Sequence, residues 1–371
     1  MDTGGRRGAG TGTAPTLEDV ARAAGVSRAT VSRVVNGVRN VDPGIQEAVR
    51  RAVAETGYVP NRAARSLVTR RSGAIALVVS GAGTDAATDA DADGAPGRGP
   101  AAGAVGGRDA TPGVLQDPFF GRVVGAVVRA LRPHGVYPVL MFADSARDRA
   151  QVVSYLGEGG ADGALLVTTR GDDPLPGMLV AAGLPAVLFA RPAPAVPNLD
   201  RVDLRHRDGG ALAARHLLER GRRRLVAIGG PRAVTASRER ITGFEEAAGS
   251  DLGAVAEADF TVDGGERAMG RLPAGRPDLD GVFAANDLMA QGACLVLREH
   301  GRRVPEDVSV VGFDDSSAAT AARPRLTTVR QPVEDMAAEM VRLLLDRLTG
   351  DGPPEPTEVL FTPSLVIRDS S

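Results

Sequence analysis

Residues 16–37, TLEDVARAAGVSRATVSRVVNG, hold the side chains whose types and spacing point most directly to a specific chemistry. We expect two short helices joined by Gly25-Val26, and the second exposes small, polar or basic side chains: Arg28, Ala29, Ser32 and Arg33. Such a helix can enter the DNA major groove with its first residues at the base edges. The hydroxyls of Ser27, Thr30 and Ser32 suit phosphate contacts, which position a helix without recognising sequence. The alternative is an ordinary three-helix domain that contacts other proteins.

Capping residues and glycines locate the helices that position this face. The predicted caps are Thr16 and Ser27, and the predicted stops are Gly25, Asn36-Gly37 and Gly57. Asp19 lies three residues after Thr16, as the acidic residue of a capping box does. A third helix is predicted from Pro43, at its first turn, to about Thr56.

A basic stretch follows at residues 58–72, YVPNRAARSLVTRRS. It places four arginines around Leu67. An apolar side chain in this setting is suited to wedging between base steps in the minor groove. A basic linker helix is the other interpretation.

Charge is distributed unevenly, although its net value is only −2. Residues 1–72 contain 12 arginines and 6 acidic residues, a balance of +6, and the remainder contains 32 and 40, a balance of −8. The sequence has no lysine. A basic head on an acidic body is what phosphate binding by one segment requires, although Arg-rich termini can also be solvated tails.

Composition argues against several classes of protein. Cys294 is the only cysteine and the four histidines are scattered, so we expect no disulfide, no metal site and no cofactor. No apolar run approaches 18 residues, which argues against a membrane protein. Residues 1–15 are predicted to be a disordered, Gly-rich leader without the apolar core of a secretory signal. We therefore expect a cytoplasmic protein.

From residue 73 onward, short apolar runs alternate with helical stretches. The runs are rich in Val, Leu, Ile and Ala and lie at residues 73–80, 137–143, 163–169, 185–190, 224–230, 281–286 and 308–315. They predict parallel sheets covered by helices on both faces. A body of about 300 residues is enough for two lobes with a ligand cleft between them.

Residues 81–113 interrupt this pattern. They contain 10 Ala, 9 Gly, 5 Asp and 3 Pro among 33 residues, and Val105 is their only large aliphatic residue. Such a stretch cannot bury enough apolar surface to offset its ordering entropy, so we predict a flexible insertion.

Blocks spread over nearly the whole chain resemble the lac-repressor/galactose-repressor family of bacterial regulators. The head contributes VSRATVSRVVNG and YVPNRAARSL. The body contributes, in the family's order, GRRRLVAIGGP, SRERITGF, ANDLMAQGA, GRRVPEDVSVVGFDD, LTTVRQPVEDM and PSLVIRDSS. The resemblance implies an α+β multidomain chain. Its residues 16–72 would form an all-α helix-turn-helix head with a hinge helix, and residues 73–371 a two-lobed α/β body like the periplasmic binding proteins.

The same resemblance implies a domain organisation and a function. The chain would cross between the lobes about three times, with residues 73–200 and 331–350 in one lobe and 201–330 and 351–371 in the other. The body would dimerise, and a small molecule between the lobes would alter affinity for a pseudo-palindromic operator. We therefore expect a homodimeric repressor whose effector is a sugar or sugar derivative. Induction and co-repression both remain open.

In the family, Arg28 and Ala29 occupy the operator-discriminating positions, Arg33 supports them and Leu67 is the hinge wedge. The full set of predicted DNA contacts adds Thr16, Ser27, Thr30, Ser32, Asn36, Tyr58, Asn61 and Arg62.

Six body residues are predicted to contact the effector: Phe119, Phe120, Arg240, Asn286, Asp287 and Asp314. Arg240 would offer a planar fork of donors to hydroxyls or a carboxylate. Asp287 and Asp314 follow predicted strands, and ligands of open α/β sheets usually bind at the carboxyl ends of strands. Helix capping is the alternative for Asn286 and Asp287. We favour one of the two phenylalanines facing the ligand, and one can equally belong to the core.

Two departures from the family leave the ligand class open: Ala190 stands where an acidic residue is common, and the 81–113 insertion lies close to the expected cleft mouth. A solute-binding transport component would carry a secretory signal and no basic head. An enzyme is disfavoured because the chain has no G-x-S-x-G, no P-loop and no G-x-G-x-x-G after a strand. A constitutive DNA binder with a decayed cleft is disfavoured by the presence of Arg240, Asp287 and Asp314.

Overall fold

The computed structural model describes residues 15–35, 41–58, 71–81, 117–168, 170–189, 196–272, 278–353 and 355–371. The chain divides into two compact units, Met1–Ser72 and Gly73–Ser371, here called the head and the body. Several predictions lie outside the described residues: those on the leader up to residue 14, Asn36, most of the 58–72 stretch with Asn61, Arg62 and Leu67, Ala190, and nearly all of the 81–113 insertion.

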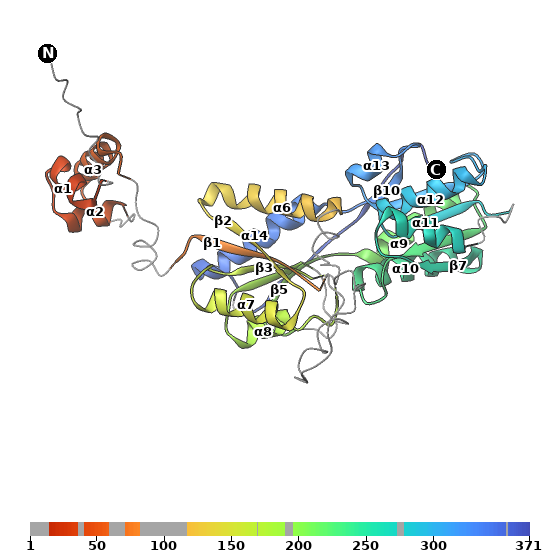
Figure 1. Cartoon of the computed structure of the whole chain (residues 1–371), viewed down its shortest axis with the longest axis horizontal. Helices are drawn as coiled ribbons and strands as arrows, with labels where there is room; N and C mark the ends of the chain where they lie inside the picture. The colour runs from red at the N-terminus through yellow and green to blue at the C-terminus, as the bar shows by residue number, and fades with distance from the viewer. Residues whose placement is uncertain are drawn as a thin grey trace, which may run out of the picture. The chain divides into compact units, whose positions relative to one another are not determined.

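Three helices form the described part of the head: α1 (Leu17–Ala24), α2 (Arg28–Val35) and α3 (Pro43–Thr56), shown in Figure 1. Thr16 and Asp19 form the predicted capping box of α1. Gly25 and Gly57, both with φ of 66°, end α1 and α3 in the left-handed conformation that glycine adopts without steric cost. The helices share one apolar core, formed by Val20, Val31, Val49 and Ala52. The predicted cap of α1, the first-turn proline of α3 and the glycine stops of both helices are confirmed, and Asp42 is the N-cap of α3.

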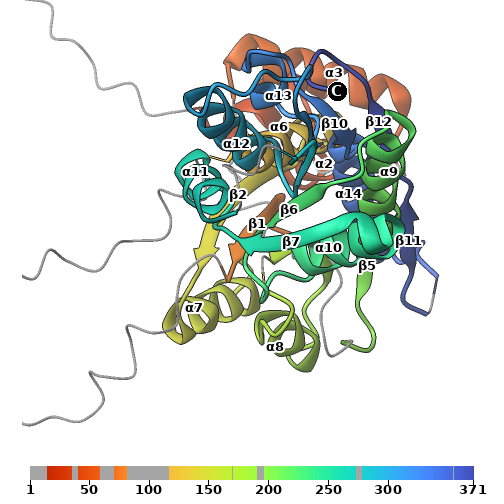
Figure 2. The same cartoon turned by 90° about the vertical axis from the view of Figure 1, so that its right-hand side faces the viewer.

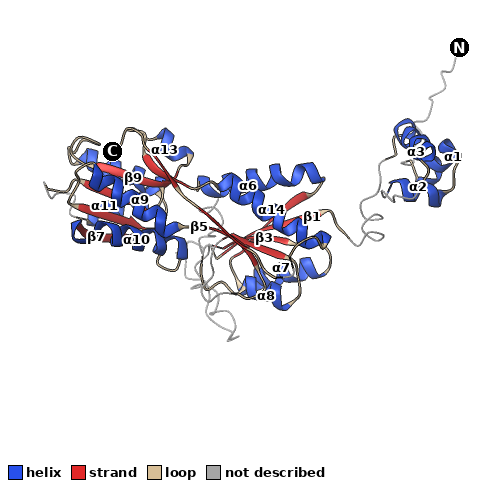
Figure 3. Cartoon of the chain, turned by 180° about the vertical axis from the view of Figure 1, so that it is seen from behind, coloured by secondary structure: helices blue, strands red, loops and turns tan. Residues whose placement is uncertain are grey.

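The first lobe of the body is a six-stranded sheet in the order β11-β5-β4-β3-β1-β2. Its strands are β1 (Ala74–Ser80), β2 (Tyr137–Ala143), β3 (Ala164–Thr168), β4 (Ala186–Phe189), β5 (Asp200–Leu204) and β11 (Glu358–Phe361). One face packs on α6 (Pro118–Leu131) and α14 (Val333–Thr349), and the other on α7 (Ala146–Gly157) and α8 (Leu175–Ala181). Figure 3 shows the strands lying between the helices. A short 3-10 turn, η2 (Arg132–His134), follows α6.

The second lobe is a six-stranded sheet in the order β12-β10-β9-β8-β6-β7. Its strands are β6 (Leu225–Gly229), β7 (Leu252–Glu257), β8 (Gly281–Ala284), β9 (Ser309–Asp314), β10 (Thr327–Arg330) and β12 (Ser364–Val366). One face packs on α9 (His206–Glu219) and α10 (Thr235–Ala248), and the other on α11 (Val262–Arg271) and α12 (Asp287–Glu299) (Figure 2). The short elements η3 (Gly249–Asp251) and α13 (Ser317–Ala321) complete it.

Successive residues of these strands are buried on opposite faces of the sheet, which explains why helices cover both faces. In the second lobe, Ala227 and Phe283 face the α9–α10 side, whereas Val226 and Val282 face the α11–α12 side. Among the described strands, every pairing is parallel except that of β10 with β12. The prediction of parallel sheets covered on both faces is confirmed, and β12 is an antiparallel addition.

The chain crosses between the lobes after β5, after β10 and after β11. The first crossing therefore follows Leu204 rather than residue 200, and the prediction that residues 351–371 all belong to the second lobe is wrong for β11. The reason is local pairing: β11 runs parallel to β5 at the edge of the first sheet. An ion pair of 2.6 Å between Arg201 and Glu358 joins the two strands.

Two glycines bring the backbones of α9 and α10 into contact. A Cβ on Gly210 would lie 1.9 Å from the carbonyl oxygen of Arg240, and one on Gly243 would lie 1.9 Å from that of Arg207. Any larger residue would therefore push the helices apart. This close approach places Arg240 of α10 against His206, the first residue of α9.

We predict that Gly210→Ala lowers the free energy of unfolding by about 1–3 kcal/mol, because the two helix backbones must separate to admit the methyl group. Denaturant unfolding of the full chain measures this change. Gly270→Ala in α11 is the matched control, since its added Cβ meets nothing within 4 Å. The control should be neutral or stabilising by up to about 1 kcal/mol. Unfolding energies that do not differ between the two variants would contradict the required contact.

Candidate effector and DNA-binding sites

The outer face of α2 presents the predicted DNA-contacting side chains. Arg28, Ala29 and Arg33 are exposed, as the sequence predicts. Ser27 Oγ accepts a hydrogen bond from the backbone N–H of Thr30 at 3.1 Å, so Ser27 caps α2 as predicted. Its hydroxyl also lies 2.8 Å from that of Thr30. The start of α2 therefore combines a free helix face with two hydroxyls and a basic side chain.

Among the described residues, Arg28 forms one ion pair, between its Nε and Glu18 Oε1 at 3.1 Å. Both side chains are more than half exposed, at 69% and 54%. An exposed pair of this kind contributes little to stability, so Arg28 can leave it for a nucleic acid at small energetic cost.

Three other predicted DNA contacts have structural neighbours within the head. Thr16 Oγ1 donates to Asp19 at 2.8 Å within the capping box. Tyr58 is half-buried and packs against the head core. Ser32 is half-buried on α2.

The polar centre of the body is an ion pair between Arg240 of α10 and Asp314, the last residue of β9. Nη1 of Arg240 lies 3.1 Å from Oδ1 of Asp314, and the residues are only 6% and 5% exposed. The guanidinium also lies over the Phe313 ring, with Cζ 3.8 Å from the centroid. Nη1 donates to the carbonyl oxygen of Ala285 at 2.6 Å, and Nε donates to His206 Nδ1 at 3.2 Å. The structure thus brings together two of the predicted effector residues.

Part of the hydrogen-bonding capacity of this pair remains unused. Among the described residues, none accepts a hydrogen bond from Nη2 of Arg240, and none donates to Oδ2 of Asp314. A guanidinium N–H group and a carboxylate oxygen side by side can bind adjacent hydroxyls of a ligand, one as donor and one as acceptor.

Asp117 of the first lobe brings a third polar group to this pair. It caps α6 by accepting a hydrogen bond from the backbone N–H of Phe119 at 2.9 Å. Burial and the nearby charge of Asp314 raise the pKa of Asp117 to about 6, while Arg240 lowers it. The sequence analysis did not select Asp117, although an acidic residue followed by proline is a recognisable helix start.

Asp314 has a strained backbone, with φ of 102°, and Asp315 follows with φ of 52°. A non-glycine residue in this region costs on the order of 1–3 kcal/mol and persists where its surroundings hold it. Arg122 of α6 donates to the carbonyl oxygen of Asp314 at 2.7 Å, and Asp315 pairs with Arg330 at 2.7 Å. These contacts hold the carboxyl end of β9 in position and link it to the first lobe.

Both polar atoms of the Asn286 side chain are bonded to backbone groups of the protein. Its Oδ1 accepts from the backbone N–H of Met289 at 2.9 Å and so caps α12, while Nδ2 donates to the carbonyl oxygen of Phe260 at 2.9 Å. The capping alternative therefore describes the geometry of Asn286.

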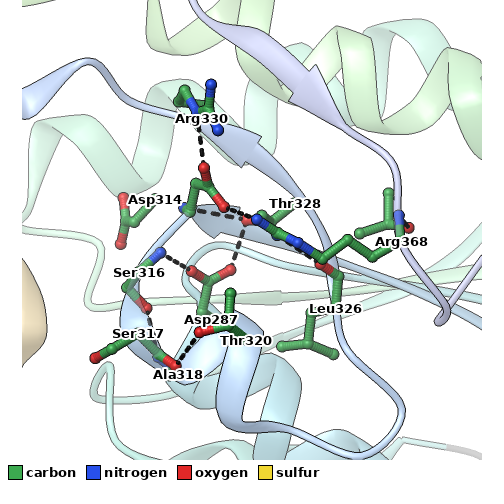
Figure 4. A network of polar contacts seen from close by, with 12 residues as sticks. Asp287, Asp314, Ser316, Ser317, Ala318, Thr320, Leu326, Thr328, Arg330 and Arg368 are labelled. Carbon is green, nitrogen blue, oxygen red and sulfur yellow. Dashed lines mark hydrogen bonds and ion pairs between the residues drawn. The ribbon is translucent and has the colours of Figure 1, made fainter.

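Asp287 supports the loop that follows β9 (Figure 4). Its two oxygens accept from the backbone N–H of Ser316 at 2.7 Å and from Thr328 Oγ1 at 2.5 Å. Burial, with the charge of Asp314, raises the pKa of Asp287 to about 7. Because both oxygens have protein donors, the geometry favours a supporting role for this carboxyl group.

The two adjacent phenylalanines have different surroundings. Phe120 is 8% exposed and belongs to the core. Phe119 is half-buried, and its ring packs edge-on against those of Phe120 and Phe189, with centroids 5.2 and 5.7 Å away. Phe119 is therefore the better placed of the two for ligand contact.

A separate hollow of about 730 Å³ lies along β7 and α11, lined by residues that include Glu257, Asp259 and Arg267. It contains none of the predicted effector residues. We assign the candidate effector site to the Arg240–Asp314 pair, with Asp117 beside it, rather than to this open surface.

Within the described ranges, no three His, Cys, Asp or Glu side chains gather to hold a metal ion. No helix in that part of the chain is long and apolar enough to cross a bilayer.

Comparison with known proteins finds family matches to both the head and the body. The family described as "Bacterial regulatory proteins, lacI family" matches residues 16–61, and the "Periplasmic binding protein-like domain" matches residues 214–371. The HTH-type transcriptional regulator CelR of Thermobifida fusca is 43% identical over 363 residues, which cover 96% of this chain and 98% of CelR.

Two solved structures extend the similarity to the whole fold. A complex of the transcriptional regulator CelR with cellobiose has a TM-score of 0.69 at 40% identity, covering 96% of this chain and 100% of the other. The lac repressor dimer bound to operator and the anti-inducer ONPF has a TM-score of 0.75 at 26% identity, covering 96% and 99%. The family resemblance and fold class predicted from the sequence are confirmed. The chain belongs to the LacI family of DNA-binding transcriptional regulators.

Proposed function

We propose that the chain is a homodimeric repressor whose affinity for a pseudo-palindromic operator is controlled by a neutral sugar of the cellobiose type. The observation that carries the proposal is the buried Arg240–Asp314 pair, in which one donor and one acceptor have no partner among the described residues. The solved structure of CelR, whose sequence is 40% identical to this chain, is a complex with cellobiose. We further propose that the protein acts in the cytoplasm, where its operator is, and catalyses no reaction.

The charge of the site favours a neutral ligand. Asp117 and Asp314 lie near the guanidinium of Arg240, and at pH 7 a carboxyl group with a pKa of about 6 is mostly ionised. The nearby guanidinium of Arg122 is paired with Glu334. The cluster therefore has an excess of negative charge, which disfavours phosphorylated or carboxylated sugars. Carboxylates and a guanidinium pair well with hydroxyl groups, and the half-buried ring of Phe119 offers an apolar surface to a sugar.

Within the proposed site, Asn286 and Asp287 shape the protein while Arg240, Asp314, Asp117 and Phe119 contact the sugar. This division follows the hydrogen bonds, because the side chains of Asn286 and Asp287 are already bonded to protein groups.

On the DNA side, we propose that Arg28 and Ala29 face base edges, that Arg33 supports them, and that Ser27 and Thr30 contact phosphates. The first three side chains are exposed on one helix, and the hydroxyls lie at its start. Thr16 and Tyr58 stabilise the head that presents this helix. Ser32, Asn36, Asn61, Arg62 and Leu67 stay predictions from the sequence.

Arg28→Ala should weaken operator binding by roughly 1–3 kcal/mol per half-site while changing binding to random DNA much less, because a base contact carries sequence information and a lost charge does not. Fluorescence anisotropy with both DNAs at one salt concentration measures this. Arg50→Ala on α3 is the control, since it also removes one exposed positive charge. If Arg28→Ala and Arg50→Ala lose the same affinity on both DNAs, Arg28 is not a base contact.

Cellobiose should change the operator affinity of the wild-type protein, and Arg240→Lys should remove that response. Lysine keeps a positive charge opposite Asp314 but lacks the planar fork, so we expect cellobiose affinity to fall at least about tenfold in calorimetry. Arg207→Lys on α9, an exposed arginine paired with Glu246, should bind cellobiose like the wild type.

Two outcomes would contradict different parts of the proposal. Normal cellobiose binding by Arg240→Lys would remove Arg240 from the site. A wild-type protein that ignores cellobiose but responds to another sugar through Arg240 would refute the ligand and keep the site.

A further inference from the structure

We propose that His206 is a positioning residue of the effector site, which aims the guanidinium of Arg240 and ties it to the first crossing between the lobes. The proposal rests on the assignment of Arg240 to the effector. His206 itself has no place in the DNA-binding or sugar-contacting sets above.

His206 is buried at the point where the chain first passes from one lobe to the other. It begins α9 of the second lobe, and β5 of the first lobe ends at Leu204 two residues earlier. Its ring is buried, with Nδ1 3.2 Å from Nε of Arg240 and Nε2 3.4 Å from Oδ1 of Asp203. Asp203 belongs to β5, and its Oδ1 also accepts from the backbone N–H of Leu204 at 2.9 Å. One imidazole therefore joins the end of β5 in the first lobe to the arginine of the second lobe.

The chemistry of the two partners determines the tautomer of the ring. An arginine Nε always carries a proton, so Nδ1 of His206 must accept. The single ring proton is then on Nε2, facing the Asp203 carboxylate. Burial and the charge of Arg240 lower the pKa of His206, while Asp203 and Asp314 oppose them. A protonated ring would set a second N–H group against Nε of Arg240.

This contact fixes which donors of Arg240 face the ligand. Nε is directed at His206 and Nη1 at Asp314 and Ala285, whereas no residue in the described ranges accepts from Nη2, which is therefore the terminal nitrogen assigned to the sugar. Without an acceptor at His206, the guanidinium can rotate and lose that orientation.

Asp314, the other member of the ion pair, is also bonded to a residue at a crossing between the lobes. Gln331 directly follows β10, and its Nε2 donates to Oδ1 of Asp314 at 2.9 Å. The buried pair is therefore held at one end by the first crossing and at the other by the second. A ligand that shifts the pair acts on two of the three connections between the lobes, which is the physical contact needed for coupling.

Two substitutions test separately the contacts of the two imidazole nitrogens. Asparagine can place an amide oxygen near the position of Nδ1, so His206→Asn keeps an acceptor for Arg240 and loses the contact with Asp203. Glutamine can place its amide near the position of Nε2, so His206→Gln keeps the Asp203 contact and removes the acceptor. Calorimetry of the full chain with cellobiose should show a dissociation constant raised about tenfold in His206→Gln and less than about threefold in His206→Asn.

A buried histidine of the same helix supplies the control. His216 is bonded to Ser371 Oγ at 2.7 Å and has no contact with Arg240. His216→Gln should lower thermal stability without changing cellobiose affinity. Equal cellobiose affinities in His206→Asn and His206→Gln would overturn the proposal, because a merely structural role would affect stability alone.

A second measurement needs no effector. The chain has only four histidines, so spectra of histidine labelled with ¹⁵N can be assigned by substitution. We expect the ligand-free protein to hold His206 as the neutral Nε2–H tautomer. A ring protonated on Nδ1 would overturn the positioning role whether or not cellobiose binds. Failure of the wild type to bind cellobiose, with the expected tautomer present, would refute only the proposed ligand.

Discussion

The buried ion pair between Arg240 and Asp314 is the interaction on which the rest of the body depends. Two charges removed from water destabilise a fold unless each has good partners, and loss of one partner typically costs about 3–5 kcal/mol. Here the guanidinium is held by His206, Ala285 and the ring of Phe313, and the carboxylate by Gln331. The close glycine contact of α9 with α10 and the strained backbone of Asp314 serve the same arrangement.

In the proposed mechanism, control of DNA binding follows from the contacts of this pair with residues at the crossings between the lobes. A ligand can shift an equilibrium only by as much as its affinity differs between the two states. Because the pair touches the first two crossings and Arg122 links its strand end to α6, a change of lobe arrangement must alter its geometry. A sugar bound there therefore has different affinities for the two arrangements. The sign of the coupling depends on which of them also orders the heads on the operator.

Features that depend on local sequence, such as apolar strands and helix caps, could be predicted. Features that depend on strand pairing between distant segments could not. Each of the seven apolar runs contains a strand, and the caps and glycines locate α1 and α3. The strands β5, DRVDL, and β11, EVLF, were not found because they are short and carry charges, and so the lobe boundaries were misplaced. Arg240 and Asp314 were identified, but Asp117 and His206 were not. Each begins a helix in sequence, and only the fold brings it beside Arg240 or Asp314.

Energetic coupling between the effector site of the body and the operator requires that each ligand changes the affinity of the protein for the other. The dissociation constant of cellobiose can be measured by calorimetry on the free protein and on the protein saturated with operator. We expect the two constants to differ, by the same factor by which saturating cellobiose changes the operator dissociation constant. Identical cellobiose constants with and without operator would contradict it.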